Sequence, residues 1–309
     1  MEWTTIESDP GVFSELIENI GVKNTGVEEI WSLDMVDDKL KEATYGLIYL
    51  FKWRADTEER TIVDCPEGLF FAKQVVQNAC ATQAILSILM NSEDIARKGE
   101  LGEALSDFKA FSTEGLDSES LGLAIGSHDL IRNAHNAFAR PDPFVMDPEE
   151  KKNLLDKGGD AYHFVAYVPF QGMVYELDGL KPGPILLGDA GGHWWDVAKP
   201  AIESRMARYE DITSCLLSVC RSKIVRLEEQ ISAHMTSGGE GAAAALQAEL
   251  DEERRKKAMQ AQENVRRRHN FTPFVLSLFT ALAKKNALRP MVDAASERRA
   301  ANATAAAKK

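Results

Sequence analysis

The chain has 309 residues, 44% of them hydrophobic and 27% charged, which is typical of a soluble globular protein. No stretch approaches the ~20 apolar residues that span a bilayer, and the first residues lack the basic and apolar regions of a signal peptide, so we expect an intracellular protein. The four cysteines form neither a Cys-x-x-Cys pair nor a zinc-spaced cluster with histidine, which predicts free thiols.

The net charge of −12 is unevenly distributed along the chain. Residues 221–309 contain 17 Lys/Arg and 10 Asp/Glu, a balance of +7, so residues 1–220 carry −19. An acidic body repels nucleic acid and favours a basic polypeptide partner. The basic part lacks interleaved aromatic residues and a nucleic-acid-binding motif, so we expect neither nucleic acid nor a membrane as a partner.

The first helix and the first strand are well marked. Ser8 or Asp9 can cap a helix that has Pro10 in its first turn, and Gly21 can end it. Residues 46–53 are continuously apolar and rich in aromatics, which predicts a buried strand.

A cysteine lies at the start of a strongly apolar helical pattern. Residues 84–89 have apolar side chains at helical spacing and almost all round, which predicts a buried helix. Asn78 is the expected N-cap, and this places Cys80 in the first turn, where the positive end of the helix dipole favours a thiolate. The alternative is that Cys80 is a small buried residue, as most free cysteines are.

The middle of the chain alternates between helical patterns and a long irregular stretch. Helices are expected near 101–112 and 116–139, and again over 194–209. Residues 141–161 are rich in proline, glycine and charge, which predicts a long loop of the kind that is often functional. Residues 213–220 predict a last core strand, so the first domain is expected to span residues 1–220.

A hairpin is predicted where strands at 162–170 and 173–178 flank a Gln-Gly pair. A two-residue loop places His163 and Asp178 on one face as diagonal neighbours, ~7–8 Å apart at Cα. The carboxylate can then orient the imidazole and stabilise its protonated form. A loop of odd length would separate the two, and a half-buried surface pair is the alternative interpretation.

Gln74 lies six residues before Cys80. Its amide, with the backbone N–H of Cys80, could hold the oxyanion of a tetrahedral intermediate, although Gln74 alone would be taken for a solvated polar residue. Cys215 and Cys220 are interpreted as core or strand residues and Cys65 as a loop thiol, so none of these three shares the context of Cys80.

The composition changes after residue 220. A polar helix and a Gly/Ala-rich stretch precede Leu246–Arg268, which predicts a long charged helix, and a short amphipathic helix follows from Phe274. We expect residues 221–292 to form a helical extension whose apolar faces need a partner or the main domain, and residues 293–309 to be a disordered tail.

The candidate residues and their neighbours resemble a known family. Gln74, Cys80 within Asn-Ala-Cys-Ala-Thr, His163 within Tyr-His-Phe-Val and Asp178 within Leu-Asp-Gly resemble the ubiquitin C-terminal hydrolase family of thiol proteases, which uses Gln, Cys, His and Asp in this order. The likeness covers residues 1–220 nearly throughout, including the Glu-Ser-Asp-Pro-Gly-Val-Phe that begins at Glu7.

This resemblance implies an α+β, papain-like fold: a six-stranded antiparallel sheet flanked by helices, with a knotted backbone and a C-terminal helical extension. It also implies that residues 141–161 cross over the active site, that Trp31 contacts ubiquitin, and that neither a metal nor an organic cofactor is needed.

The segment Glu263–Phe274 resembles the C-terminal extension of the proteasome-associated branch of the family. That likeness implies docking on a proteasomal ubiquitin receptor through residues of about 263–290, a chromatin-remodelling complex as a further partner, and a cytoplasmic and nuclear location. The Ala-rich end and the Gly/Ala stretch at 236–245 depart from the branch.

The sequence therefore predicts hydrolysis of the peptide or isopeptide bond after ubiquitin's terminal glycine. Cys80 would attack, His163 would act as base and then acid, Asp178 would orient His163, and Gln74 would stabilise the oxyanion. Two alternatives stay open: a catalytically weak ubiquitin-binding adaptor recruited by its extension, and a different Cys-His-Asp acyl-transfer enzyme such as an acetyltransferase.

Overall fold

The structure, a computed structural model, describes residues 3–53, 60–112, 115–139, 162–209, 214–237 and 239–306. It divides into two compact units, one that runs to Arg267 and one that includes Arg268–Lys309. The first unit thus continues well past the boundary expected at residue 220. The loop predicted at 141–161 lies outside the described residues.

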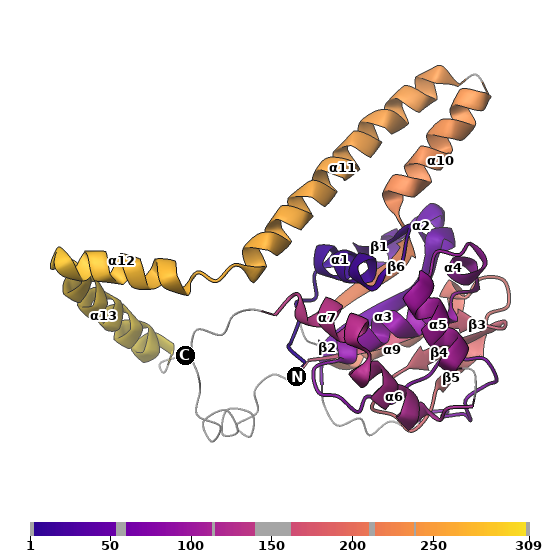
Figure 1. Cartoon of the computed structure of the whole chain (residues 1–309), viewed down its shortest axis with the longest axis horizontal. Coiled ribbons are helices and arrows are strands. Elements are labelled where there is room, and N and C mark those ends of the chain that lie inside the picture. Colours follow the sequence, from indigo (N-terminus) through magenta and orange to yellow (C-terminus); the bar gives the residue numbers. More distant parts are fainter. Residues whose placement is uncertain are drawn as a thin grey trace. The chain divides into compact units, whose positions relative to one another are not determined.

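A six-stranded antiparallel sheet forms the centre of the first unit (Figure 1), as predicted. Its strand order is β1-β6-β2-β3-β4-β5, so the last strand in sequence is inserted between the first two. The strands are β1 (Thr25–Glu29), β2 (Thr44–Lys52), β3 (Tyr162–Phe170), β4 (Met173–Leu177), β5 (Ile185–Asp189) and β6 (Cys215–Arg221).

Helices cover both faces of this sheet. In the first unit they are α1 (Pro10–Ile20), the 3-10 turn η1 (Leu33–Met35), α2 (Asp38–Ala43), α3 (Cys80–Asn91), α4 (Glu93–Arg97), α5 (Glu103–Ser112), α6 (Ser118–Ser127), α7 (Asp129–Asn136), α9 (Trp195–Tyr209), α10 (Lys223–Thr236) and α11 (Glu240–Arg268). The helix expected over 116–139 is two helices, because the backbone of His128 is extended between α6 and α7.

Alternation along β2 separates two cores. Ile48 and Leu50 pack with α1, α3 and α5–α7 on one face, while Tyr49 and Phe51 pack with α9 on the other. Successive strand side chains point to opposite faces, so a strand with a core on each side is apolar throughout. Burial on both faces explains why residues 46–53 form a continuous apolar run in the sequence.

The caps of α1 confirm the sequence signals. The Asp9 carboxylate accepts hydrogen bonds from Gly11 N at 2.8 Å and Val12 N at 3.1 Å, and Pro10 takes the first helical position. Gly21 ends the helix at φ 106°, a left-handed conformation that costs glycine little.

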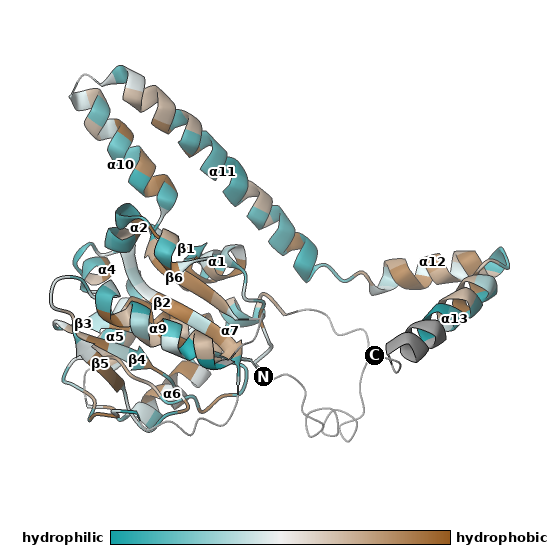
Figure 2. Cartoon of the chain, turned by 180° about the vertical axis from the view of Figure 1, so that it is seen from behind, coloured by the Kyte–Doolittle hydropathy of each residue, from teal (hydrophilic) through white to brown (hydrophobic). Residues whose placement is uncertain are grey.

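Polar contacts join α11 to α10 and to α1. Arg254 on α11 lies 2.7 Å from Glu228 on α10, and Lys257 of α11 lies 2.5 Å from Glu18 on α1. Figure 2 shows α11 as mostly hydrophilic, in contrast to the hydrophobic strands of the sheet. This helix is therefore held by ion pairs and hydrogen bonds more than by apolar burial.

The second unit contains α12 (Thr272–Lys284) and α13 (Leu288–Ala306). The disorder expected for residues 293–309 differs from the helix that the structure gives up to Ala306, and residues 307–309 lie outside the described part. Alanine is the strongest helix former, so an Ala-rich end can be helical without a core.

In the described part of the chain, no helix is both long and apolar enough to cross a membrane.

A buried ionic cluster connects α9 to the sheet. Arg205 is 1% exposed and its guanidinium donates to the equally buried carboxylate of Glu176, which also accepts from Arg60 at 3.1 Å. The guanidinium lies 4.3 Å from the ring centroid of Phe51, and the edge-to-face contact of that ring reaches His163 at 5.9 Å. The cluster thus supports one wall of the region around His163.

We predict that Arg205→Leu lowers the free energy of unfolding by about 3–5 kcal/mol, because Glu176 stays buried after losing a charged partner. Urea denaturation measures this, and Arg208→Leu, an exposed position on the same helix, should cost less than about 0.5 kcal/mol. Replacing Arg205 and Glu176 together by leucine should recover part of the loss. An effect of Arg205→Leu no larger than that of Arg208→Leu would contradict the importance of the cluster.

Candidate active site

Cys80 is the first residue of α3, as predicted, but Asn78 is not the N-cap. Ala79 is the N-cap and makes no side-chain capping bond. Asn78 has φ 64°, and its side-chain amide donates instead to the carbonyl of Trp3 at 2.9 Å. Asparagine tolerates this left-handed conformation better than most residues, so Asn78 turns the chain sharply into the helix rather than capping it.

Cys80 is half-buried, whereas every other residue of α3 is buried. The first amides of a helix have no partner within it, and the helix dipole is positive at this end. A thiolate at Cys80 would therefore lie where the local field favours a negative charge.

His163 and Asp178 meet as the hairpin register predicts. Phe170 pairs with Met173 across a two-residue turn, and the pairing continues in register to the end of β4. His163 Nε2 then lies 2.7 Å from Asp178 Oδ1, with both side chains almost completely buried. The same carboxylate oxygen accepts the backbone N–H of Leu180 at 2.9 Å, so the orientation of Asp178 is fixed from two sides.

The electrostatics of the pair favour an imidazolium next to a carboxylate. Burial alone would lower the pKa of His163, but hydrogen bonds and charge interactions with Asp178 and Cys80 outweigh it and raise that pKa to about 9. Burial would raise the pKa of Asp178, but its hydrogen bond to His163 and the positive charge there hold it below its usual value. The raised pKa of His163 and the lowered pKa of Asp178 both indicate a protonated imidazole paired with an ionised carboxylate.

Gln74 lies beside the same small hollow as Cys80. This hollow of about 10 Å³ is lined by both residues, Phe164 of β3 and Gly179, among others. The backbone N–H of Gln74 donates to Gly179 O at 2.8 Å, while its side-chain amide makes a long 3.3 Å bond to Val76 O. The amide is thus near the thiol but only weakly held by its own partner.

The other cysteines do not share this environment. Burial and the carboxylate of Glu29 raise the pKa of Cys215 to about 12, and burial with the nearby Glu28 raises that of Cys220 further. Such thiols stay protonated at neutral pH, whereas nucleophilic attack needs a thiolate. Both lie on β6, which confirms their interpretation as strand residues.

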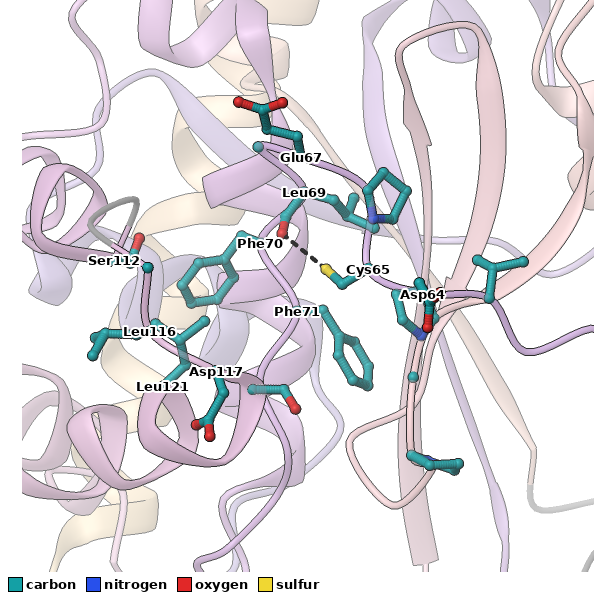
Figure 3. A pocket seen from close by; sticks show the side chains of 18 of the residues that line it. Asp64, Cys65, Glu67, Leu69, Phe70, Phe71, Ser112, Leu116, Asp117 and Leu121 are labelled. Carbon is teal, nitrogen blue, oxygen red and sulfur yellow. Dashed lines mark hydrogen bonds between the residues drawn. The ribbon is translucent and has the colours of Figure 1, made fainter.

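Cys65 lines a different hollow from the one beside Cys80. This hollow has a volume of about 1160 Å³. Figure 3 shows Cys65 among the residues that line it, with its sulfur donating to Leu69 O, and this bond is 3.3 Å long. Phe70, Phe71 and Leu116 are among the other lining residues, but Cys80, His163 and Asp178 are not. Burial raises the pKa of this thiol, and none of the described residues that line the hollow is a histidine that could activate it.

Trp31, which the family resemblance predicts to contact ubiquitin, follows β1 and is 86% exposed. Sequence reasoning missed Met35, which lies four residues further on and is 84% exposed. Two large apolar side chains this exposed on one short segment indicate an interaction surface more than a packing role.

Sequence reasoning also missed residues that surround the site without a charge of their own. Gln83 and Gly179 line the hollow beside Cys80, and the only signal for them was a polar residue in an apolar helix and a glycine after an acidic residue. Within the described ranges, no cluster of three or more His, Cys, Asp or Glu residues could hold a metal ion.

Comparison with known proteins identifies the family of the chain. Residues 3–207 match the family model "Ubiquitin carboxyl-terminal hydrolase, family 1", and residues 243–288 match a C-terminal model described as "Ubiquitin carboxyl-terminal hydrolases". A ubiquitin carboxyl-terminal hydrolase isozyme L5 from Dictyostelium discoideum is 43% identical, covering 96% of this chain and 95% of its own. The Caenorhabditis elegans hydrolase ubh-4 is 41% identical over 94% of this chain and 90% of its own.

A solved structure extends the likeness to the fold. The crystal structure of Trichinella spiralis UCH37 bound to ubiquitin vinyl methyl ester matches with a TM-score of 0.68 and 32% identity, covering 84% of this chain and 99% of that one. The family model covers well over half of the chain, and the relatives align along nearly its whole length. The chain therefore belongs to family 1 of the ubiquitin carboxyl-terminal hydrolases and is a deubiquitinating cysteine peptidase.

Proposed function

We propose that Cys80, His163, Asp178 and Gln74 carry out hydrolysis of the bond after ubiquitin's terminal glycine. The observation that carries this assignment is the buried 2.7 Å bond between His163 Nε2 and Asp178 Oδ1, in a pair whose imidazole also interacts with the thiol of Cys80. With Nε2 used by Asp178, the free ring nitrogen Nδ1 is the one that can exchange a proton with the sulfur.

The reaction then follows in two halves. The Cys80 thiolate adds to the glycine carbonyl carbon, and the C–N bond breaks as His163 gives its proton to the leaving amine. This leaves a thioester on Cys80 and a neutral imidazole. The imidazole takes a proton from water as the hydroxide adds to the thioester carbonyl and the C–S bond breaks. This frees the Cys80 thiolate and restores the imidazolium–carboxylate pair, while the new carboxylic acid of ubiquitin releases its proton to solvent and leaves as a carboxylate.

Gln74 is assigned to the developing negative charge. In each half-reaction the carbonyl oxygen becomes an oxyanion, and preorganised donors stabilise it more than they stabilise the substrate. The amide of Gln74 can turn from its long bond to Val76 O toward this oxygen, with the backbone N–H of Cys80 as second donor.

The exposed segment with Trp31 and Met35 is proposed to contact ubiquitin. The family's substrate is itself a folded protein, so binding needs an apolar surface as well as a cleft for its C-terminal tail. The balance of −19 over residues 1–220 also suits a basic tail.

The extension is proposed to dock this hydrolase on a proteasomal ubiquitin receptor, in the cytoplasm and the nucleus, and to offer the same surface to a chromatin-remodelling complex. Within the expected range of 263–290, Asn264 is already used by α1, since it donates to Gly11 O. Support for docking therefore comes from α12, where Phe274, Val275, Leu276, Leu278 and Phe279 are all exposed. Figure 2 shows α12 as largely hydrophobic.

Cys80→Ala is predicted to abolish release of a fluorophore from the C-terminus of ubiquitin, because the attacking sulfur is lost. Cys215→Ala is the matched control and should keep most of the activity, since that thiol is protonated and has no part in the proposed mechanism. The assay is continuous fluorescence with full-length protein. Equal activity in Cys80→Ala and the unmodified enzyme would remove Cys80 from the mechanism, and no activity in either protein would favour the adaptor alternative.

Asp178→Asn is predicted to lower kcat by about 10²-fold or more, because the imidazolium loses its partner. It should also change the pH dependence of stability. The folded-state pKa of His163, about 9, lies above the ordinary value of 6.5, so the pair's contribution is complete below pH 6.5 and is lost as pH rises through 9.

Urea denaturation of both proteins at several pH values measures this second effect. The stability gap between the wild-type chain and Asp178→Asn should be widest near pH 6 and narrow by pH 9.5, whereas the exposed Asp196→Asn should show no such trend. A gap that stays constant with pH would contradict the ion pair.

Phe274→Ala combined with Leu278→Ala is predicted to weaken binding to a purified proteasomal ubiquitin receptor at least tenfold, because the two side chains share one helix face. Hydrolysis of the fluorogenic ubiquitin substrate should be unchanged. Met259→Ala, an exposed apolar position on α11, is the control. Unchanged receptor binding in the double variant, measured by surface plasmon resonance, would exclude α12 as the docking element.

A further inference from the structure

Three polar residues interrupt the apolar surface of α3 at intervals of four. Gln83, Ser87 and Asn91 are 6%, 4% and 4% exposed, so they are buried together with the apolar residues around them. Residues four apart lie on one face of a helix. Burying a polar group without a partner is costly, so this stripe needs a reason.

The stripe faces the extended segment that carries Gln74. The side chain of Asn91 pairs with both backbone groups of Phe70, accepting its N–H at 2.8 Å and donating to its carbonyl at 2.9 Å. Eight residues closer to Cys80 on the same helix, the Gln83 side-chain amide donates to the carbonyl of Ala72. The helix thus holds this segment by its backbone, and the last such contact lies two residues before Gln74.

Gln83 also packs against the segment that carries Asp178. A Cβ added to Gly179 would collide with Gln83 Nε2 and would lie 3.0 Å from the backbone nitrogen of Gln74. The absence of a side chain at Gly179 lets its carbonyl accept the Gln74 N–H at 2.8 Å. Gln83 thus lies on the helix of Cys80 and contacts both the segment before Gln74 and the residue after Asp178.

We propose that Gln83 is a positioning residue that fixes the backbone at Ala72, and through it the reach of Gln74 toward the oxyanion. This inference rests on the proposed role of Gln74. The side chain of Gln74 is poorly held by its own 3.3 Å bond to Val76 O, so its position is set by the backbone beneath it. Oxyanion donors act only within a narrow geometry, and a shift of about 1 Å can cost up to 10²-fold in rate.

A double-mutant cycle between Gln83 and Gln74 tests this proposal. Gln83→Met keeps the length of the side chain but removes the donor, and Gln74→Ala removes the proposed oxyanion amide. The readouts are kcat and KM for a fluorogenic ubiquitin substrate, and the rate at which iodoacetamide alkylates Cys80. Alkylation forms no oxyanion, so it reports on the thiol and its imidazole alone.

Gln83→Met is expected to lower kcat by roughly tenfold, with little change in KM or in the alkylation rate. On the Gln74→Ala background, Gln83→Met should have no further effect on kcat. Ser87→Ala, on the same helix face but with no role in holding the Ala72 carbonyl, is the matched control and should leave kcat near its starting value. If Gln83→Met does not fold, Gln83→Ala removes the same donor without adding a charge beside Cys80 and should give the same pattern.

Two outcomes separate failure of this inference from failure of the mechanism. If Gln83→Met lowers kcat by the same factor with and without Gln74, Gln83 acts on the fold and the proposal is wrong. The proposal is also wrong if Gln83→Met slows alkylation of Cys80 by the same factor as it lowers kcat. If Gln74→Ala alone leaves kcat unchanged, the proposed role of Gln74 fails, and the role of Gln83 fails with it.

Discussion

The buried hydrogen bond between His163 and Asp178 is the interaction on which the rest of the site depends. Two ionisable groups in a low-dielectric interior are costly unless each compensates the other, and here the directions of both pKa shifts describe an imidazolium facing a carboxylate. Such a pair keeps the imidazole protonated at neutral pH, so that the proton is available for transfer to a leaving group. In the proposed mechanism the imidazolium stabilises the Cys80 thiolate, and its proton goes to the leaving amine.

Two separate parts of the fold bring the proposed catalytic groups together. The β3–β4 hairpin fixes His163 and Asp178 by strand register, so a slip of one residue would move them to opposite faces. Cys80 comes from the other side, at the start of α3, which packs on β3 through its apolar face. The sharp turn at Asn78 leads the chain into α3, and Gln83 and Asn91 of that helix hold the backbone of the segment before Gln74.

The sequence could predict much of this because the decisive signals are local. A two-residue hairpin loop determines which residues pair, and a strand that is apolar throughout must be covered on both faces, so the hairpin, β2 and the site pair follow from short-range rules. The family resemblance supplied the six-stranded sheet. By contrast, the true N-cap at Ala79 could not be foreseen, because the Asn78 side chain is taken up by Trp3, which lies 75 residues away in the sequence.

The contributions of Gln83 and Gly179 were hidden for a similar reason: their partners are backbone atoms of segments distant in the sequence. The same holds for α11: its hydrophilic sequence predicted a long charged helix but not the ion pair and hydrogen bond that attach it to α1. Propensity and composition describe what a segment can do alone, while polar contacts between segments appear only when the fold is assembled.

The most direct test of the central claim is to locate the protons on the His163 ring by nitrogen-15 NMR of the resting full-length protein at pH 7.5. Chemical shifts that show both ring nitrogens protonated, with Nε2–H bound to the ionised Asp178, would agree with the account. A neutral ring with a single protonated nitrogen at that pH would contradict it, because the site would then hold no stored proton for the leaving group.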